Sequence, residues 1–315
     1  MIQMKRCTIC PNNCLIDNAI CGRKPNFDEN IVETTVIAID PIEKKPLYHF
    51  LPGTKTLSIG TLGCNLKCLN CQNHSIAQPE NPDKVETKNY TPEEIVKLAL
   101  DNNIKSISWT YNEPTIHPEW IINTAKIAQQ HNIKTILVTN GYTSQETLEK
   151  LKKYVDAVNV DLKSPEELFY EKVCLGHLEP VLNSINFYLN NKIHLEITTL
   201  LITDLNSDSV PEVVETIKEL DTNIPIHFSA FYPQHKLSTL PPTDPDLIYD
   251  ACFFATGFDL KYVYSGNVPH SNYDNTYCKF CDDLLIEREG YSVKNYIENG
   301  KCTKCENMIN DVIEE

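Results

Sequence analysis

The stretch Ser58-Ile-Gly-Thr-Leu-Gly-Cys64-Asn-Leu-Lys-Cys68-Leu-Asn-Cys71-Gln-Asn73 contains three cysteines with the spacing CxxxCxxC, directly after a short predicted strand. A structural zinc ion takes four protein ligands, and here only His74 lies near enough in sequence to join the three cysteines. Three thiolates in one loop suit a 4Fe–4S cluster that keeps one iron open for another ligand. The stretch therefore favours a catalytic iron–sulfur site, with structural zinc as the alternative.

Short β-branched runs alternate with helical segments after this loop, a pattern typical of βα units with parallel strands. Helix start signals occur at Thr91, which precedes Pro92 and Glu94, and a further helix is expected over 244–257. Six strands are predicted, at residues 56–60, 105–110, 134–139, 157–161, 193–202 and 225–231, and a seventh near 260–264.

Six or seven βα units fall short of the eight that close a barrel. We therefore predict an α/β fold with a partial, open (β/α)6 barrel; a doubly wound sheet would give the same alternation. Both architectures place functional side chains at the carboxyl ends of the strands. The expected domains are a cysteine-rich extension over 1–52, the barrel over 53–268 and a zinc-ribbon-like extension over 269–315.

The composition is that of a globular protein: 41% of the 315 residues are hydrophobic and 23% are charged. The 28 Lys and Arg against 43 Asp and Glu give a net charge of −15, which disfavours nucleic-acid binding. We see neither an apolar run of membrane-spanning length nor a signal peptide, so we expect a cytoplasmic protein without membrane contact. Thirteen cysteines in a reducing compartment indicate metal thiolates rather than disulfides.

Two further cysteine sets lie near the ends of the sequence. Two CxxC pairs twenty residues apart match a zinc ribbon, although this spacing also suits rubredoxin-like iron or a further cluster: Cys278, Cys281, Cys302 and Cys305. The other set suits zinc or an auxiliary iron–sulfur cluster, and its position before the central loop favours zinc slightly: Cys7, Cys10, Cys14 and Cys21. Cys174 and Cys252 stand alone and are expected to be small buried hydrophobes.

Several other stretches match a known pattern: DPIEKKPLYHFLPGT, WTYNEPT, VTNGY, VDLK and LKYVYSGN. With GCNLKCLNCQN they make the chain resemble radical S-adenosylmethionine (radical SAM) enzymes. More narrowly, it resembles the radical SAM member of the AmmeMemoRadiSam system, a relative of the pyruvate formate-lyase activating enzymes. The resemblance spans essentially the whole chain.

The resemblance implies that Cys64, Cys68 and Cys71 hold a 4Fe–4S cluster whose fourth iron binds the amino and carboxylate groups of SAM. Reductive cleavage of SAM then gives a 5′-deoxyadenosyl radical, which abstracts hydrogen from a substrate. A ferredoxin or flavodoxin is the expected electron donor, and Memo-like and AMMECR-like proteins are the expected partners.

Other positions are candidate SAM contacts because most of them follow predicted strands: Glu113, Thr139, Asn140, Asp161, Lys163 and His227. A carboxylate at Glu113 suits the methionine amino group, and Lys163 suits its carboxylate. Structural roles, such as a hydrogen-bonded core histidine at His227, remain alternatives. Two positions depart from the family pattern, because Asn70 replaces an aromatic residue and Val138 replaces an aspartate that helps to bind a cation in the activating enzymes.

Three hypotheses follow. The first is an oxygen-sensitive radical SAM enzyme of the AmmeMemoRadiSam type that acts on a protein or a metabolite. The second is an activase that places a glycyl radical on a partner enzyme. The third, from another class, is a non-catalytic zinc-thiolate scaffold.

Overall fold

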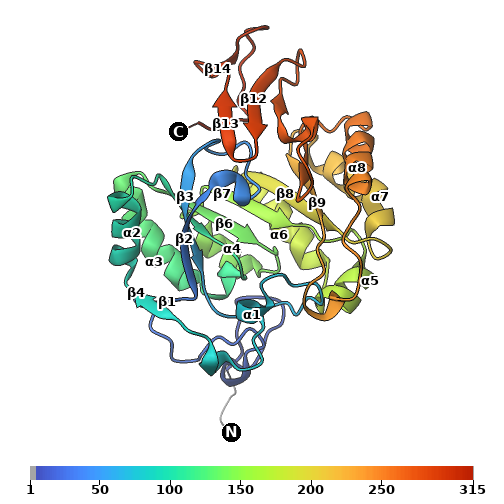
Figure 1. Cartoon of the computed structure of the whole chain (residues 1–315). Helices are drawn as coiled ribbons and strands as arrows, with labels where there is room; N and C mark the ends of the chain where they lie inside the picture. The colour runs from blue at the N-terminus through green and yellow to red at the C-terminus, as the bar shows by residue number, and fades with distance from the viewer. Residues whose placement is uncertain (1–4, 315) are drawn as a thin grey trace.

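Seven parallel strands follow one another in chain order across the central sheet (Figure 1). The structure, a computed structural model, describes residues 5–314. The parallel strands are β3 (Lys55–Gly60), β5 (Ser106–Trp109), β6 (Lys134–Thr139), β7 (Ala157–Asp161), β8 (His194–Leu201), β9 (Ile226–Ala230) and β10 (Val263–Gly266). A doubly wound sheet reverses its order at a switch point, and this sheet does not. The predicted partial barrel is therefore confirmed.

One antiparallel strand, β2 (Val36–Pro41), extends the sheet beyond β3. Among the described residues β2 and β10 form the two free edges, so the barrel is open. Residues 36–41 precede the domain boundary expected near residue 52, yet they pair with the main sheet. The division into domains itself stays a prediction.

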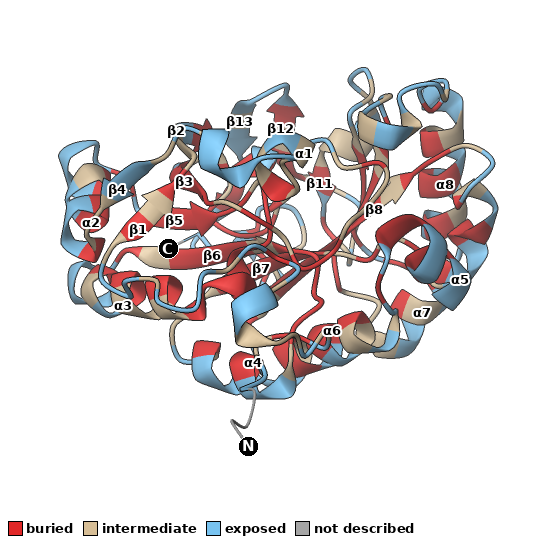
Figure 2. Ribbon diagram, turned by 90° about the horizontal axis from the view of Figure 1, so that it is seen from below, coloured by how far each residue is buried: buried red, intermediate tan, exposed pale blue. Residues whose placement is uncertain are grey.

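Six crossover helices connect the parallel strands: α2 (Pro92–Asp101), α3 (Pro118–Ala128), α4 (Gln145–Leu151), α6 (Glu179–Asn190), α7 (Val210–Leu220) and α8 (Pro245–Gly257). The capping box predicted at Thr91 is present, because its side chain accepts from the backbone of Glu94 and the Glu94 side chain accepts in return. These helices cover the outer face of the sheet, and Figure 2 shows that the strands between them are buried.

Strand alternation separates an apolar outer face from a more polar inner face, which we call the lumen. On β5, Ile107 and Trp109 join the core under the helices, whereas Ser106 and Ser108 lie on the other face and are fully buried. The Ser108 hydroxyl hydrogen-bonds the Thr56 hydroxyl of the neighbouring strand β3 on this face at 2.7 Å. The lumen thus offers polar groups that packing alone does not require.

Residues 42–53, between β2 and β3, fill the amino-terminal end of the barrel, and we call this segment the plug. Its apolar side chains pack against β6 and β7: Ile42, Leu47, Phe50 and Leu51 form a cluster with Ile136 and Ala157. The buried carboxylate of Glu196 on β8 accepts the backbone N–H groups of Tyr48 at 3.0 Å and His49 at 2.8 Å. The plug is therefore fixed by both packing and hydrogen bonds.

A small C-terminal ribbon covers the plug, at the top of Figure 1. It consists of β11 (Thr276–Tyr277), β12 (Leu284–Glu289), β13 (Ser292–Asn295), β14 (Ile297–Glu298) and β15 (Lys301–Cys302). Arg288 is 1% exposed and joins the ribbon to the plug, because it donates to the Tyr48 carbonyl at 2.6 Å and lies over the Tyr48 ring. The plug and the ribbon thus both cover the amino-terminal end of the barrel.

The N-terminal segment lies at the opposite end, near α1 (His74–Ala77), at the bottom of Figure 1. Its strand β1 (Val32–Thr34) pairs with β4 (Lys88–Tyr90) outside the main sheet. In the part of the chain that the structure describes, no helix has the length and apolar character needed to cross a membrane.

Candidate functional site

The three cysteines of the CxxxCxxC loop lie just beyond the carboxyl end of β3, where the sequence placed them. A neighbouring segment holds their loop: Lys67 N–H donates to the Cys174 carbonyl at 3.0 Å and Leu69 N–H to the Val173 carbonyl at 2.8 Å. Both carbonyls belong to a π-helical turn, Tyr170–Cys174, a feature that occurs frequently at functional sites. This clamp joins residues a hundred positions apart.

Burial sets the chemistry of these thiols. It raises the pKa values of Cys64 and Cys71, and contact with Cys174 together with burial raises that of Cys68. A buried thiolate is stable only beside positive charge, and a metal centre supplies it. The donor set therefore fits a metal cluster.

Gly63 lets the N-terminal segment approach this loop. Its φ is +95°, and a Cβ at this position would lie 1.9 Å from the carbonyl oxygen of Cys21. Only glycine allows both this backbone conformation and this contact. The second cysteine set is consequently packed against the residue that precedes Cys64.

The sequence assigned Glu113 to the amino group of SAM. In the structure its carboxylate oxygens accept hydrogen bonds from groups of the protein itself. Its buried carboxylate accepts from Thr115 N–H at 3.0 Å, Thr115 hydroxyl at 2.7 Å, Thr139 hydroxyl at 2.8 Å and Asn140 N–H at 2.8 Å. Burial raises the pKa of Glu113 in spite of these bonds. In this structure Glu113 and Thr139 tie the end of β5 to the end of β6, which the sequence did not indicate.

Asn140 extends from this tie to the cysteine loop. Its side-chain amide donates to Asn65 Oδ1 at 2.9 Å and lies 3.6 Å from Cys64 Sγ. Asn65 in turn donates to the Tyr142 carbonyl at 2.7 Å. The predicted residue Asn140 therefore lies at the first cysteine of the loop.

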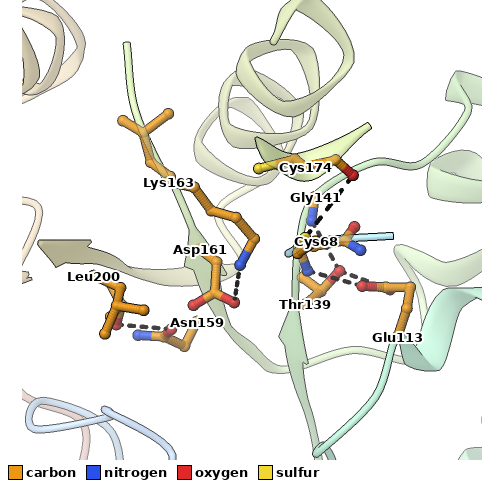
Figure 3. A network of polar contacts seen from close by, with 12 residues as sticks. Cys68, Glu113, Thr139, Gly141, Asn159, Asp161, Lys163, Cys174 and Leu200 are labelled. Atoms are coloured by element: carbon orange, nitrogen blue, oxygen red, sulfur yellow. Dashed lines mark hydrogen bonds and ion pairs between the residues drawn. The ribbon is translucent and has the colours of Figure 1, made fainter. Parts of the chain in front are cut away.

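Asp161 and Lys163 lie together at the end of β7, with Lys163 Nζ 2.9 Å from Asp161 Oδ2. Burial lowers the pKa of Lys163, but Asp161, Cys68 and Cys174 outweigh that effect and raise it well above its usual value. Figure 3 shows Lys163 and Asp161 on one side of Cys68 and Glu113 on the other. Lys163 therefore stays protonated and provides a positive charge beside the cysteine loop.

Asn70, the departure from the family pattern, contributes an unused acceptor. The residue is 7% exposed, and its buried Oδ1 has no hydrogen-bond partner among residues 5–314. Such an oxygen is costly unless a donor reaches it, and an adenine amino group is a suitable donor. The loop after β9 also contacts this region, since Lys236 N–H donates to the Leu69 carbonyl and His235 stacks on His74. Sequence patterns gave no sign of that loop.

His227 lies elsewhere. It is the second residue of β9 and is buried under the plug, where its Nε2 is 2.7 Å from Glu196 Oε2 and its ring contacts Tyr48 and Tyr264. His227 was expected to contact SAM. Its side chain points to the expected face of β9, but it lies at the amino-terminal end of the strand and not at the carboxyl end. The alternative given for it, a hydrogen-bonded core histidine, is what the structure shows.

The cysteines of the ribbon form a closed four-thiol group. All four sulfurs lie within 4.8 Å of one another, and the pairs Cys278–Cys305 and Cys281–Cys302 are each separated by 3.7 Å. A tetrahedral ion with bonds of about 2.3 Å requires a sulfur separation of about 3.8 Å. Hydrogen bonding from the Asn307 backbone lowers the pKa of Cys305 to about 6, which favours a thiolate. The ribbon can therefore hold one metal ion.

The remaining cysteines fall in two places. Cys174 and Cys252 are fully buried, as predicted, although Cys174 also contacts Cys68. The N-terminal set lines one small cavity at the catalytic end of the barrel: Cys7, Cys10, Cys14 and Cys21.

Comparisons with known proteins agree with this geometry. The chain is 38% identical to the uncharacterized protein MJ0808 of Methanocaldococcus jannaschii, over 98% of this chain and 96% of that protein. It is 27% identical to a pyruvate formate-lyase-activating enzyme of Clostridium pasteurianum, over 38% of this chain and 50% of that protein. The Streptococcus suis SuiB structure superposes with a TM-score of 0.53 at 16% identity, covering 70% of this chain and 52% of SuiB, and so supports the fold.

The sequence profile of the Radical SAM superfamily matches residues 58–218, about half of the chain. That region begins at the strand before Cys64 and includes the Glu113, Asn140 and Lys163 positions. Members of this superfamily use a 4Fe–4S cluster and SAM, which the partly buried three-cysteine loop fits. By this match and by its full-length relative, the chain belongs to the radical SAM superfamily.

Proposed function

We propose that the chain is a radical SAM enzyme of the AmmeMemoRadiSam type that acts on a protein or metabolite substrate. The observation that carries the proposal is the loop with Cys64, Cys68 and Cys71 at the carboxyl end of β3, clamped by the π-helical turn. The motifs that resemble this system occur on both sides of the loop, and the 38% identity to MJ0808 extends over 98% of the chain.

In this proposal the three cysteines hold the 4Fe–4S cluster. When reduced, the bound cluster supplies one electron that cleaves SAM to methionine and a 5′-deoxyadenosyl radical, which takes a hydrogen atom from the substrate. Lys163 binds the methionine carboxylate, because its charge is fixed beside Cys68. The unpaired Oδ1 of Asn70 accepts the adenine amino group.

Glu113 is then a positioning residue. Its carboxylate orders Asn140 through the backbone N–H, and the Asn140 side chain points to Cys64 Sγ. A hydrogen bond to a cluster sulfur tunes the reduction potential. Glu113 therefore acts on the cluster through Asn140.

A glycyl-radical activase is the second candidate. Activating enzymes for pyruvate formate-lyase, choline trimethylamine-lyase and 4-hydroxyphenylacetate decarboxylase are 27 to 28% identical over about a third of this chain. Electron paramagnetic resonance after incubation with a candidate partner separates the two proposals, because an activase leaves a persistent glycyl doublet. The third hypothesis, a non-catalytic zinc scaffold, conflicts with membership of the superfamily.

The proposed partners are a ferredoxin or flavodoxin as electron donor, and Memo-like and AMMECR-like proteins. Each can be tested by anaerobic co-purification with this chain. Recovery of neither class with the intact protein would remove the partner proposal and leave the SAM chemistry untouched.

The central test is anaerobic reconstitution followed by an assay for 5′-deoxyadenosine. We expect product that depends on reductant, and deuterium transfer into it from a labelled substrate. Cys71→Ala should lose the cluster, about four irons per chain, and all product. Cys174→Ala is the matched control, because this buried thiol contacts Cys68 outside the motif, and the variant should keep its iron. Equal iron loss in both variants, or no product from the wild type, would refute the proposal.

A further inference from the structure

We propose that Cys7, Cys10, Cys14 and Cys21 bind a second 4Fe–4S cluster, adjacent to the cysteine loop of the barrel. Four observations carry this assignment: the cavity that the cysteines share, the spacing of their sulfurs, the attachment of the segment to the catalytic end, and the difference in burial among the four. The metal site stands on geometry alone, and the role given to it below rests on the proposed function.

The four cysteines converge although they span fifteen residues. All of them line one cavity, whose other walls are mainly apolar and include Ile9, Ile20 and Ile116. The Cys7 N–H donates to the Cys14 carbonyl at 2.8 Å, which holds two of the four side by side.

The sulfurs of the N-terminal set are less tightly grouped than those of the ribbon. In the ribbon, the four sulfurs lie within 4.8 Å of one another, as one tetrahedral ion requires. Within the described residues, neither the N-terminal set nor the three-cysteine loop of the barrel forms such a tight group. A cubane places its four cysteines on different irons and so needs wider spacing. The N-terminal set therefore resembles the catalytic loop in this respect, and differs from the ribbon.

The segment is attached to the catalytic end of the barrel by its own contacts. Arg23 pairs with both oxygens of Glu119 at 2.9 and 3.0 Å and donates to the Ile116 carbonyl at 2.7 Å. The Asn12 amide donates to the Asn65 carbonyl at 2.7 Å, one residue beyond Cys64. The Cys21 carbonyl packs on Gly63, whose Cα is about 3.8 Å from that of Cys64. The two cysteine sets are thus neighbours in space.

The four cysteines differ in how far they are buried. Cys10 and Cys21 are 9% and 7% exposed, whereas Cys7 and Cys14 are partly exposed. One side of the site therefore faces the barrel loop and the other faces solvent. With a cysteine on every iron, no position remains for a substrate, so electron transfer is the role that fits. One electron enters from a low-potential ferredoxin or flavodoxin and leaves to the barrel site, so the N-terminal site returns to its oxidised state.

Metal content tests the assignment without relying on SAM cleavage. The full-length chain is reconstituted anaerobically with iron and sulfide, and iron and zinc are counted together with Mössbauer and electron paramagnetic resonance spectra. We expect about eight irons and one zinc per chain in the wild type. The triple variant Cys64→Ala/Cys68→Ala/Cys71→Ala should retain about four irons in a reducible 4Fe–4S cluster. The same triple variant with no iron and about two zincs would overturn the proposal.

A reciprocal variant provides the control. Cys10→Ser/Cys21→Ser should lose about four irons and keep the remaining cluster and the zinc. Its reduction by flavodoxin should slow, while its reduction by dithionite, a small donor that needs no docking site, should not. Unchanged iron, or loss of zinc in place of iron, would contradict the site. If the double variant does not fold, the triple variant still decides, because its N-terminal cysteines are intact.

Discussion

Replacing Glu196 with glutamine tests how the closed end of the barrel is held together. The carboxylate is completely buried and accepts four hydrogen bonds, from the backbone of Tyr48 and His49 and from the rings of His194 and His227. One backbone N–H faces each oxygen. In either orientation of a glutamine amide, the NH2 group faces one of these backbone N–H groups. Both groups are donors, so that hydrogen bond is lost.

The expected loss can be worked from these contacts. A hydrogen bond to a charged group contributes about 1.5–3 kcal/mol, and a buried donor left unpaired costs about 1–3 kcal/mol. Loss of one backbone bond and weakening of the others should lower the free energy of unfolding by about 3–5 kcal/mol, the range seen when a buried charged pair is broken. Urea unfolding of the reconstituted protein at neutral pH measures the change. Glu219→Gln, on the exposed face of α7, is the control and should change it by under about 0.5 kcal/mol.

The same variant should alter the response to acid. Burial raises the pKa of Glu196, but the hydrogen bonds from His194 and His227 outweigh burial and hold the pKa well below its usual range. The carboxylate therefore stabilises the fold fully above the unfolded-state pKa of about 4.3, and this contribution is lost as the pH falls toward the folded-state value. Wild type should lose more stability than Glu196→Gln below about pH 5. Parallel pH profiles, or a change under about 1 kcal/mol at neutral pH, would refute this account.

Three further predictions concern the metal sites. Gly63→Ala should force the Cys21 carbonyl away and cost at least about 1–2 kcal/mol, with iron lost from the barrel loop; iron analysis showing full occupancy would contradict it. Lys163→Met should weaken SAM binding about 10- to 100-fold with iron retained, as measured by calorimetry, and unchanged affinity would remove Lys163 from the SAM site. Cys278→Ser should release zinc and open residues 276–312 to protease while the iron count stays constant; a protected ribbon without metal would show that its small apolar core suffices.

Local patterns in the sequence predicted the features that depend on neighbouring residues. The spacing of Cys64, Cys68 and Cys71 located the catalytic loop, and alternation of strands and helices gave the partial barrel. The closed tetrahedral geometry of the ribbon likewise follows from its two CxxC pairs. In each case the residues that define the feature lie close together in the chain, so their pattern is visible without knowledge of the fold.

The features that the sequence did not predict depend on contacts between distant segments. Glu113 has the residue type for binding an ammonium group, but Thr139 and Asn140 reach it from the next strand and occupy its oxygens. His227 lies on the expected face of β9, yet alternation does not indicate the level along the barrel. The clamp on Leu69 joins two backbone groups, and backbone contacts leave no pattern in side chains.

The plug and the ribbon also determine how molecules reach the barrel. With the amino end closed by both, SAM and any substrate reach the barrel from the end where Cys64 lies or through the open side between β2 and β10, and products leave by these routes. A protein substrate that docks over these openings would trap the nucleoside beneath it until the complex separates. Under the proposed function, turnover on a protein should then be limited by undocking, whereas turnover on a small metabolite should not. A comparison of single and multiple turnovers would reveal which kind of substrate the enzyme uses.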